Sequence, residues 1–382
     1  MNTDSGEEMP VKMLYILNLA EKVNNFSYSA MIAAQKLGIE FSIAGNWGYP
    51  NDAAREADEK KYGIKIYQVD FIRTPYDPRN YKAYRQIKAI MEREKFDLIH
   101  CNTPIGGIIG RLAAKKCGIK TVIYQAHGFH FYKGAPFVNR ALFYPVEKFL
   151  AKYTDTLVTI NKEDFGTAKT FKLRNGGEVR YVHGVGIDLS AYDGVSEHRA
   201  EKRRELCLGD DDIAVISVGE LNKNKNNIVI AQAMAEVNNK NLHYFLCGVG
   251  QEEAAIKSFA ADHGLTENIH FLGYRNDVKE LLSACDIFVM PSFREGLSRS
   301  LMEAMACGLP CVVSKIRGNT DLVPKGGGHL CAPSSPTEFA EGLKDCIASD
   351  RKAMGELNMQ SVKNFDISIV IAEWEKIYKD VL

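Results

Sequence analysis

Two successive series of short apolar runs, separated by amphipathic segments, constrain the fold of this chain most. The runs are rich in Val, Ile and aromatic residues and are apolar throughout, which is typical of parallel strands buried on both faces. The strand-like runs are 11–19, 41–45, 64–71, 96–101, 121–126, 156–160 and 179–186, and then 213–219, 242–248, 268–273, 286–292 and 310–314. Two such series predict an α/β protein with two doubly wound, Rossmann-like domains.

Helix-like stretches lie between these runs, and a further one ends the chain. They span residues 81–95, 106–118, 227–238, 277–285 and 368–382. The chain has 382 residues, more than one hydrophobic core usually serves. We therefore predict Rossmann-like domains over 1–188 and 189–365, followed by a terminal helix over 366–382. Ligands of such folds bind beyond the carboxyl ends of the strands, so two facing sheets predict a shared site in a cleft.

The two halves of the chain carry opposite charge, although the whole chain is neutral. Residues 1–188 hold 27 Lys and Arg against 20 Asp and Glu, a net charge of +7. Residues 189–382 hold 21 against 28, a net charge of −7. Within 101–150 there are seven basic residues and one acidic residue. This asymmetry favours an anionic partner or surface at the N-terminal half, with a set of solvated lysines as the alternative.

The cysteines and the lengths of the apolar runs indicate the cellular compartment in which we expect the protein. The nine cysteines include no C-x-x-C pair. Five of them lie among apolar residues: Cys101, Cys207, Cys247, Cys285 and Cys311. We expect reduced, buried thiols in a cytosolic protein rather than a disulfide frame or a zinc site. The polar N-terminus predicts no signal peptide. Because no apolar run reaches the roughly 18–20 residues of a membrane span, any membrane contact would be peripheral.

The stretch PSFREGLSRSLMEAMACGLPCVV, residues 291–313, places two glutamates eight residues apart. Glu295 lies in a turn, and Glu303 lies on a short helix that Ser298 or Ser300 can cap. With Ser300 as the cap, Ser300 and Glu303 would form a capping box, which is a structural role. Alternatively, the amides at the helix start face a phosphate or sugar oxygen, and both glutamates accept hydrogen bonds from hydroxyls beside it. A nucleotide-sugar combines an anion with many hydroxyls.

Polar or glycine-rich loops follow three other strand-like runs of the C-terminal half, and one follows a run of the N-terminal half. The residues concerned are Gly219, Lys223 and Lys225, then Gly248 and Gly250, then Tyr274 and Arg275, and in the N-terminal half His127. Lysines in such a loop bind a diphosphate as point charges, or they are simply solvated. Glycines allow a ligand to approach the backbone closely. His127 ends its strand beside Gly128, where it has either a structural role or one in the cleft.

Taken together, these stretches resemble the signature of family 4 retaining glycosyltransferases with the GT-B fold. The resemblance rests on the E-x7-E spacing of Glu295 and Glu303, and on VGELNKNKN, CGVGQEE, FLGYRNDV, GVGID and AHGFHFYKG, in the family's order. The stretch 126–155 is similar to the branch that builds bacterial exopolysaccharide or capsule repeat units. The resemblance implies an acceptor-binding N-terminal domain and a nucleotide-sugar-binding C-terminal domain. It also implies that the terminal helix crosses back onto the N-terminal domain.

The resemblance implies a role for each matching residue. Glu303 would bind the ribose of the donor, and Glu295 would bind hydroxyls of the donor sugar. Lys225 would bind the diphosphate, and His127 would lie near the transferred sugar. Further contacts with the donor would be made by backbone or flanking groups. These belong to Gly296, Leu297, Ser298, Gly219, Gly248, Gly250, Tyr274 and Arg275.

Two features depart from the family pattern. The family often has an arginine directly after the strand glycine, where this chain has Glu220, which would repel phosphate. Lys225 would then act alone, or with Arg294, Arg299 or Lys223. The first loop, residues 18–30, lacks the paired glycines that are frequent there, so its role in placing the acceptor is open.

The reaction implied is transfer of a sugar from a UDP-sugar to a hydroxyl with retention of anomeric configuration. It requires no enzymatic nucleophile, metal or cofactor. A lipid-linked saccharide at the cytoplasmic leaflet is the expected acceptor, with peripheral contact to the anionic membrane and no nucleic acid partner. The alternatives are a UDP-sugar epimerase of the same fold and a non-catalytic nucleotide-sugar-binding subunit of a polysaccharide assembly complex.

Overall fold

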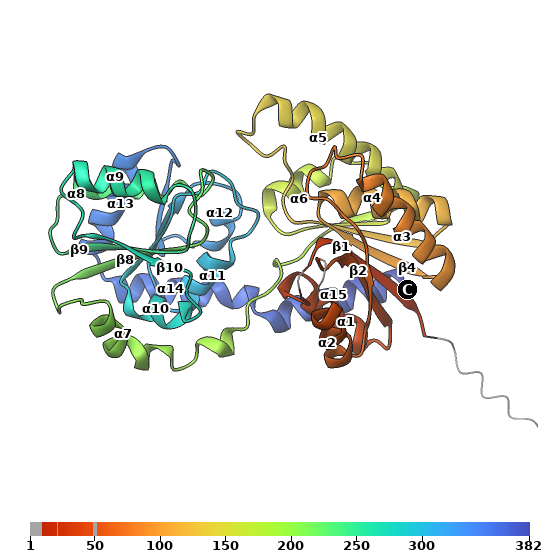
Figure 1. The fold of residues 1–382 in the computed structure, drawn as a ribbon, viewed down its shortest axis with the longest axis horizontal. Helices are drawn as coiled ribbons and strands as arrows, with labels where there is room; N and C mark the ends of the chain where they lie inside the picture. Colours follow the sequence, from red (N-terminus) through yellow and green to blue (C-terminus); the bar gives the residue numbers. More distant parts are fainter. Residues whose placement is uncertain (1–9, 21, 49–51) are drawn as a thin grey trace, which may run out of the picture. The chain divides into compact units, whose positions relative to one another are not determined.

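The computed structural model describes residues 10–20, 22–48 and 52–382. The chain forms two compact units (Figure 1): unit 1 is Met1–Gly186 together with Ile367–Leu382, and unit 2 is Ile187–Asp366. The polar N-terminal segment, for which the sequence predicts no signal peptide, lies outside the described residues. None of the helices described is long and apolar enough to cross a bilayer.

The described part of unit 1 contains a seven-stranded sheet in the order β3-β2-β1-β4-β5-β6-β7, in which neighbouring strands are parallel. Its strands are β1 (Lys12–Leu19), β2 (Glu40–Asn46), β3 (Lys65–Gln68), β4 (Leu98–Asn102), β5 (Thr121–Ala126), β6 (Thr156–Thr159) and β7 (Glu178–Tyr181). Its helices are α1 (Asn25–Lys36), α2 (Asp52–Tyr62), α3 (Asn80–Glu94), α4 (Pro104–Cys117), α5 (Phe137–Leu150), η1 (Ala151–Tyr153), α6 (Lys162–Ala168), η2 (Arg174–Gly176) and α15 (Ile367–Val381).

Alternate residues of β1 enter two different cores of unit 1, because successive side chains of a strand point to opposite faces. Leu14 and Ile16 pack with α3 and α4, whereas Met13 and Tyr15 pack with α1 and α15. Trp374 of α15 is buried in the second core. The last helix of the chain is therefore part of unit 1, although the preceding 180 residues or so form unit 2.

The described part of unit 2 contains a six-stranded parallel sheet in the order β10-β9-β8-β11-β12-β13. Its strands are β8 (Ile213–Val218), β9 (Leu242–Cys247), β10 (Ile269–Gly273), β11 (Ile287–Met290), β12 (Cys311–Ser314) and β13 (Gly328–Cys331). Its helices are η3 (Leu189–Tyr192), η4 (Val195–His198), α7 (Arg199–Glu205), α8 (Ile228–Val237), α9 (Glu253–Asp262), α10 (Val278–Ala284), α11 (Arg299–Ala306), α12 (Asn319–Leu322), α13 (Pro336–Ala348), α14 (Arg351–Val362) and η5 (Lys363–Phe365).

The prediction of two doubly wound parallel sheets is confirmed, and the strand order of unit 2 locates its ligand edge. The order reverses between β8 and β11, which are hydrogen-bonded neighbours with helices on both faces. In such a sheet, the loops after the two central strands open a crevice at the carboxyl edge. The loops that carry Lys225 and Glu295 follow β8 and β11 respectively.

Two details differ from the sequence prediction. Strand β13 was not predicted, because GGGHLC opens with three glycines and looks like a loop. Cys207 was expected to be buried, but it is exposed in the turn after α7 and has a φ of 57°. All nine cysteines are free thiols.

Candidate active site

An ion pair joins the loops that follow the two central strands of unit 2. The ammonium nitrogen of Lys225 lies 2.8 Å from Oε1 of Glu295. The lysine side chain is 23% exposed and the glutamate side chain is 15% exposed. The fold therefore brings together two of the residues that the sequence analysis names as candidates. Their roles in binding a donor stay predictions.

The loop that presents Lys225 is fixed by side chains of its own asparagines. Asn222 accepts a hydrogen bond from the amide of Lys225 at 3.0 Å. Asn226 adopts a left-handed conformation, with a φ of 53°, and donates to the carbonyl of Pro333 at 2.7 Å. Asparagine tolerates this conformation better than most residues. The run NKNKNN is therefore held by side chains of its own, although Lys223 within it is exposed.

Gly219 makes room for the lysine. A Cβ atom at this position would lie 3.4 Å from Cε of Lys225, and its φ is 144°. The side chain of Lys225 thus passes over the bare backbone of Gly219 on its way to Glu295. Glu220, which follows, is exposed.

The loop that presents Glu295 is held by residues that the sequence analysis did not select. Nε of Arg317 donates to the carbonyl of Glu295 at 3.1 Å, and Asn224 donates to the carbonyl of Arg294 at 3.1 Å. Gly318 has a φ of 79°, and a Cβ there would lie 2.4 Å from the carbonyl oxygen of Gly296. The dipeptide Arg317–Gly318 lies in the loop that follows β12, two residues beyond the end of that strand. A charged residue beside a glycine in such a loop points to this edge of the sheet, but it does not predict the contact with Glu295.

Helix α11 is capped by Ser298. The hydroxyl oxygen of Ser298 accepts a hydrogen bond from the amide of Leu301 at 3.4 Å, so the alternative with Ser300 as the cap is wrong. Glu303 consequently lies two residues too far along the helix to form a capping box with Ser298. Its Oε1 instead accepts from Nε of Arg299, one turn earlier, at 2.8 Å.

The carboxyl group of Glu303 is largely removed from water. Burial raises its pKa, and the nearby Arg299 guanidinium and the Tyr192 hydroxyl oppose that rise. Burial also raises the pKa of Tyr192, and Glu303 raises it further, so its phenol remains a hydrogen-bond donor. An acceptor beside a helix start suits a neutral, hydroxyl-rich ligand group next to an anion.

Gly248 and Gly250 have structural reasons to be glycines. A Cβ at Gly248 would lie 1.9 Å from the carbonyl oxygen of Gly219, and one at Gly250 would lie 2.2 Å from that of Leu221. The amide of Leu221 also donates to the carbonyl of Val249 at 3.0 Å. The loops after β8 and β9 therefore pack backbone against backbone. Their contact with a ligand stays a prediction.

Tyr274 and Arg275 follow β10 but differ in their surroundings. The ring of Tyr274 is 79% exposed and free to stack on a flat ligand group. The guanidinium of Arg275 forms ion pairs with Asp277 and Glu205, each at 2.6 Å. These two carboxylates raise the pKa of Arg275 further above its usual range. A phosphate would have to compete with them for this arginine.

His127 belongs to unit 1, where it follows β5. Its Nε2 lies 3.1 Å from Oδ1 of Asn102 at the end of β4, and its ring packs against the edge of the Phe26 ring. Burial lowers the pKa of His127 to about 4, so the ring is neutral at pH 7. Because an amide oxygen only accepts, Nε2 carries the proton and Nδ1 is an acceptor. A neutral ring suits hydrogen bonding to a sugar hydroxyl.

No group of three or more His, Cys, Asp or Glu side chains within 10–20, 22–48 and 52–382 is arranged to hold a metal ion. Two ion pairs lie at the carboxyl edge of unit 2, one between Lys225 and Glu295 and one between Arg299 and Glu303.

Two family models match the chain over separate regions. Residues 198–361 match "Glycosyl transferases group 1", and residues 49–161 match "Glycosyl transferase 4-like". The structure is similar to that of Anabaena Alr3699/HepE in complex with UDP. The TM-score is 0.78 at 19% identity, and 97% of this chain and 100% of that one are covered. The two units thus have the GT-B fold of glycosyltransferases.

Relatives in sequence identify the family of glycosyltransferases to which the chain belongs. EpsD of Bacillus subtilis (strain 168), whose own description as a glycosyltransferase is provisional, is 33% identical over 335 residues, which cover 85% of this chain and 87% of the relative. The Escherichia coli UDP-Gal:alpha-D-GlcNAc-diphosphoundecaprenol alpha-1,3-galactosyltransferase is 29% identical over 271 residues, which cover 67% of this chain and 70% of the relative. The chain belongs to the family 4 glycosyltransferases and is similar to those of exopolysaccharide synthesis.

Proposed function

We propose that this glycosyltransferase moves a sugar, with retention, from a UDP-sugar to a hydroxyl of a lipid-linked saccharide in exopolysaccharide or capsule synthesis. The reaction would take place at the inner face of the cell membrane, without a metal ion or cofactor. The observation that carries the proposal is the pair of Lys225 and Glu295, held together at the carboxyl edge of unit 2 beside the start of α11.

The lysine would bind the diphosphate of the donor. Lys225 lies in the loop that Asn222 and Asn226 hold in place. Within the described part of the chain, Glu295 is the one ion-pair partner of its ammonium group. A diphosphate carries more negative charge than one carboxylate and can displace it. Amides at the start of α11 would add dipolar stabilisation of the same anion.

The carboxylates would bind hydroxyls. Once the diphosphate has taken Lys225, Glu295 is left as an acceptor for hydroxyls of the donor sugar. Glu303 lies further along α11 and has a raised pKa because of burial, which suits the ribose hydroxyls. Neither carboxylate is assigned as a nucleophile.

The chemical step would break the bond between the anomeric carbon and the diphosphate oxygen. UDP leaves with the electron pair, stabilised by Lys225 and the helix-start amides. The acceptor hydroxyl attacks the anomeric carbon from the same face and passes its proton to the leaving phosphate oxygen. His127, neutral at pH 7, would accept a hydrogen bond from a hydroxyl of the transferred sugar.

Similar proteins support the choice of substrates. The Escherichia coli relative is named for transfer from UDP-Gal to a diphosphoundecaprenol-linked sugar, and the structural neighbour is a complex with UDP. A Campylobacter jejuni relative, 23% identical over 343 residues, is likewise named for a diphospho-undecaprenol-linked acceptor. These names favour UDP as the nucleotide and a polyprenyl diphosphate-linked saccharide as the acceptor.

The proposal is tested with the purified full chain, a panel of UDP-sugars and lipid-linked saccharide acceptors. We expect UDP release that depends on both substrates, and a product whose anomeric configuration, read by NMR, matches that of the donor. Conversion of one UDP-sugar into another without an acceptor would instead establish an epimerase. UDP binding with no turnover on any acceptor would establish a binding subunit.

Two variants then locate the site. Glu295→Gln and Lys225→Ala should each reduce kcat/KM by roughly a hundredfold or more. Lys240→Ala, which removes an exposed lysine of the same unit, is the matched control and should keep full activity. Full activity in both test variants would remove the proposed site.

A further inference from the structure

Helix α5 of unit 1 exposes most of its apolar side chains. Of its 14 residues, only Glu147 and Leu150 are buried. Five large apolar residues are exposed along it: Phe137, Val138, Leu142, Val146 and Phe149. Phe137 is 81% exposed and Phe149 is 52% exposed. Their spacing places all five on one side of the helix, together with Ala141 and Pro145, and we call this side the α5 stripe.

The opposite side of α5 is fixed to unit 1. Oε2 of Glu147 lies 2.8 Å from the guanidinium of Arg111 on α4, and the hydroxyl of Tyr124 donates to Oε1 at 3.0 Å. The Arg111 guanidinium also stacks on the Tyr124 ring, 3.8 Å from its centroid. Rotating α5 to hide the stripe would separate a buried ion pair, which is costly. The stripe is therefore held outward.

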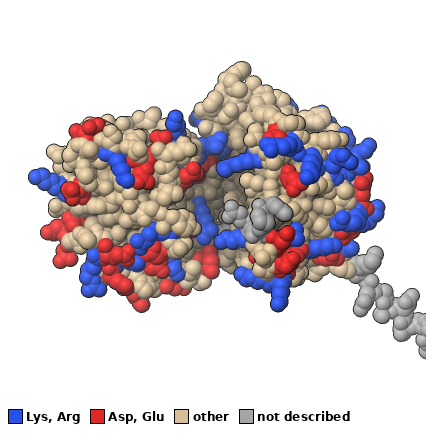
Figure 2. Space-filling model, in the orientation of Figure 1, with Lys and Arg blue, Asp and Glu red and all other residues tan. Residues whose placement is uncertain are grey.

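The segment that carries the α5 stripe, residues 101–150, is basic. The single acid within 101–150 is Glu147, and it is buried against Arg111. The exposed basic side chains of the same segment are Lys115, Lys116, Lys120, Lys133, Arg140 and Lys148. Figure 2 shows the surface over α5, at the top of the view, as largely uncharged. An apolar face with basic neighbours is the composition of helices that lie in the interface of an anionic bilayer.

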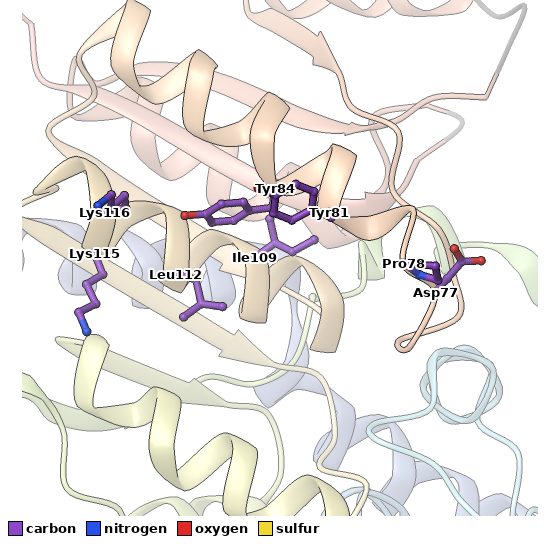
Figure 3. A pocket seen from close by; sticks show the side chains of 8 residues that line it. All are labelled: Asp77, Pro78, Tyr81, Tyr84, Ile109, Leu112, Lys115 and Lys116. Atoms are coloured by element: carbon purple, nitrogen blue, oxygen red, sulfur yellow. The ribbon is translucent and has the colours of Figure 1, made fainter.

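A cavity of about 900 Å³ opens beside α3 and α4, near the end of α5 (Figure 3). Its wall includes the rings of Tyr81 and Tyr84 and the side chain of Leu112, with Lys115 at its rim. The ammonium of Lys115 also donates to the hydroxyl of Tyr153, in the turn that follows α5, at 2.7 Å. The wall is apolar between Lys115 and Lys116 at one end and Asp77, which pairs with Arg79, at the other.

The geometry points to the α5 stripe as a membrane-docking surface whose partner is an anionic lipid bilayer: the apolar side chains enter the interface and the surrounding lysines meet lipid phosphates. The inference deepens the proposed function, and rests on it only in placing the acceptor in a membrane. Charge complementarity selects the partner, because a second copy of the chain would bring the same positive charges together.

The experiment measures binding of the full chain to sedimented vesicles without any sugar substrate. Vesicles of phosphatidylcholine with about 30% phosphatidylglycerol are compared with vesicles of phosphatidylcholine alone. We expect binding to the anionic vesicles only, and a loss of roughly tenfold or more in the partition coefficient for the double variant Phe137→Ser/Phe149→Ser. Leu357→Ser, at an exposed apolar residue of α14 in unit 2, is the matched control and should bind normally.

Charge is tested separately with Lys116→Glu/Lys148→Glu, which should weaken binding to the anionic vesicles, against Lys240→Glu as control. Analytical ultracentrifugation tests the alternative that the α5 stripe binds a second copy of the chain. Absence of vesicle binding by the wild type, or equal binding by the stripe variant, would overturn the inference. So would a wild-type dimer that the stripe variant dissociates.

Transfer assays separate this inference from the proposed function. The stripe variant should transfer sugar to a water-soluble acceptor analogue at the wild-type rate and lose rate only on acceptors embedded in vesicles. Failure of the wild type to transfer to any acceptor would refute the proposed function and leave the vesicle result standing.

Discussion

Lys225 and Glu295, seventy residues apart in the chain, form an ion pair of 2.8 Å across the point where the strand order of unit 2 reverses. The pair satisfies the lysine in the absence of a donor. A diphosphate must therefore compete with the carboxylate. This gives the two residues opposite expected effects on the binding of UDP alone.

Lys225→Ala should weaken UDP binding by about tenfold to a hundredfold, because a hydrogen bond to a charged group contributes about 1.5–3 kcal/mol. Glu295→Gln should leave UDP affinity unchanged or raise it, because the competing charge is gone, while it lowers transfer from the UDP-sugar. Isothermal titration calorimetry with UDP measures both effects. If Glu295→Gln weakened UDP binding as much as Lys225→Ala, the carboxylate would be orienting the lysine rather than competing for it.

Gly250→Ala should destabilise unit 2. The added methyl group would lie 2.2 Å from the carbonyl oxygen of Leu221, so the backbone must move, at a cost of about 1–3 kcal/mol. The expected fall in Tm is about 2–4 °C for each kcal/mol in a unit of this size. Gly166→Ala is the control, since a Cβ there meets nothing within 4 Å and the site lies within a helix. An unchanged Tm for Gly250→Ala would mean that the two loops can separate freely.

The fold could be predicted because a strand that is buried on both faces is apolar along most of its length, and this pattern is visible in the sequence. The runs at β1 and β8 are apolar over most of their length, and the structure buries them between two cores. Strand β13 (Gly328–Cys331) lacks this apolar pattern. Gly328 is the reason, because a Cβ there would lie 1.9 Å from the carbonyl oxygen of Cys311, so close strand packing selects a residue that looks like a loop former.

The site could be predicted in part. The spacing of Glu295 and Glu303 and the lysine loop are visible along the chain, and the structure brings Lys225 to Glu295. The supports of these residues could not be predicted, because they come from loops far away in sequence. Arg317 reaches the Glu295 carbonyl from beyond β12, and Asn226 reaches the Pro333 carbonyl beyond β13. Only the tertiary fold sets such contacts.

Arg111 and Glu147 form the ion pair that anchors α5, and the effects of replacing them on the free energy of unfolding should be strongly coupled. Arg111 and Glu147 are 1% and 8% exposed. Arg111→Met should cost about 3–5 kcal/mol, because it leaves a buried carboxylate without its counter-charge. The double variant Arg111→Met/Glu147→Leu should recover much of that loss. A double-mutant cycle in denaturant unfolding measures the coupling, and additive losses would show that the two side chains act independently.

The stability of the protein should fall as the solution is acidified below neutrality, and His127 should contribute to that fall. Burial lowers the pKa of His127 from 6.5 in a free side chain to about 4, so the unfolded chain binds its proton more readily than the folded chain does. Burial acts in the same direction on His100, whose pKa falls to about 3. The stabilising effect of the neutral rings is therefore complete above pH 6.5 and is lost as the pH drops toward 4.

His127→Gln removes one of these two groups and should make the decline of the free energy of unfolding between pH 6.5 and 4 less steep, while leaving the profile above pH 6.5 unchanged in shape. Urea unfolding at a series of pH values measures the slope. The same profile in both proteins would mean that the ring accepts a proton in the folded state without cost. His127 would then be able to meet the donor phosphates as a cation, and the neutral hydrogen-bonding role proposed for it would have to be abandoned.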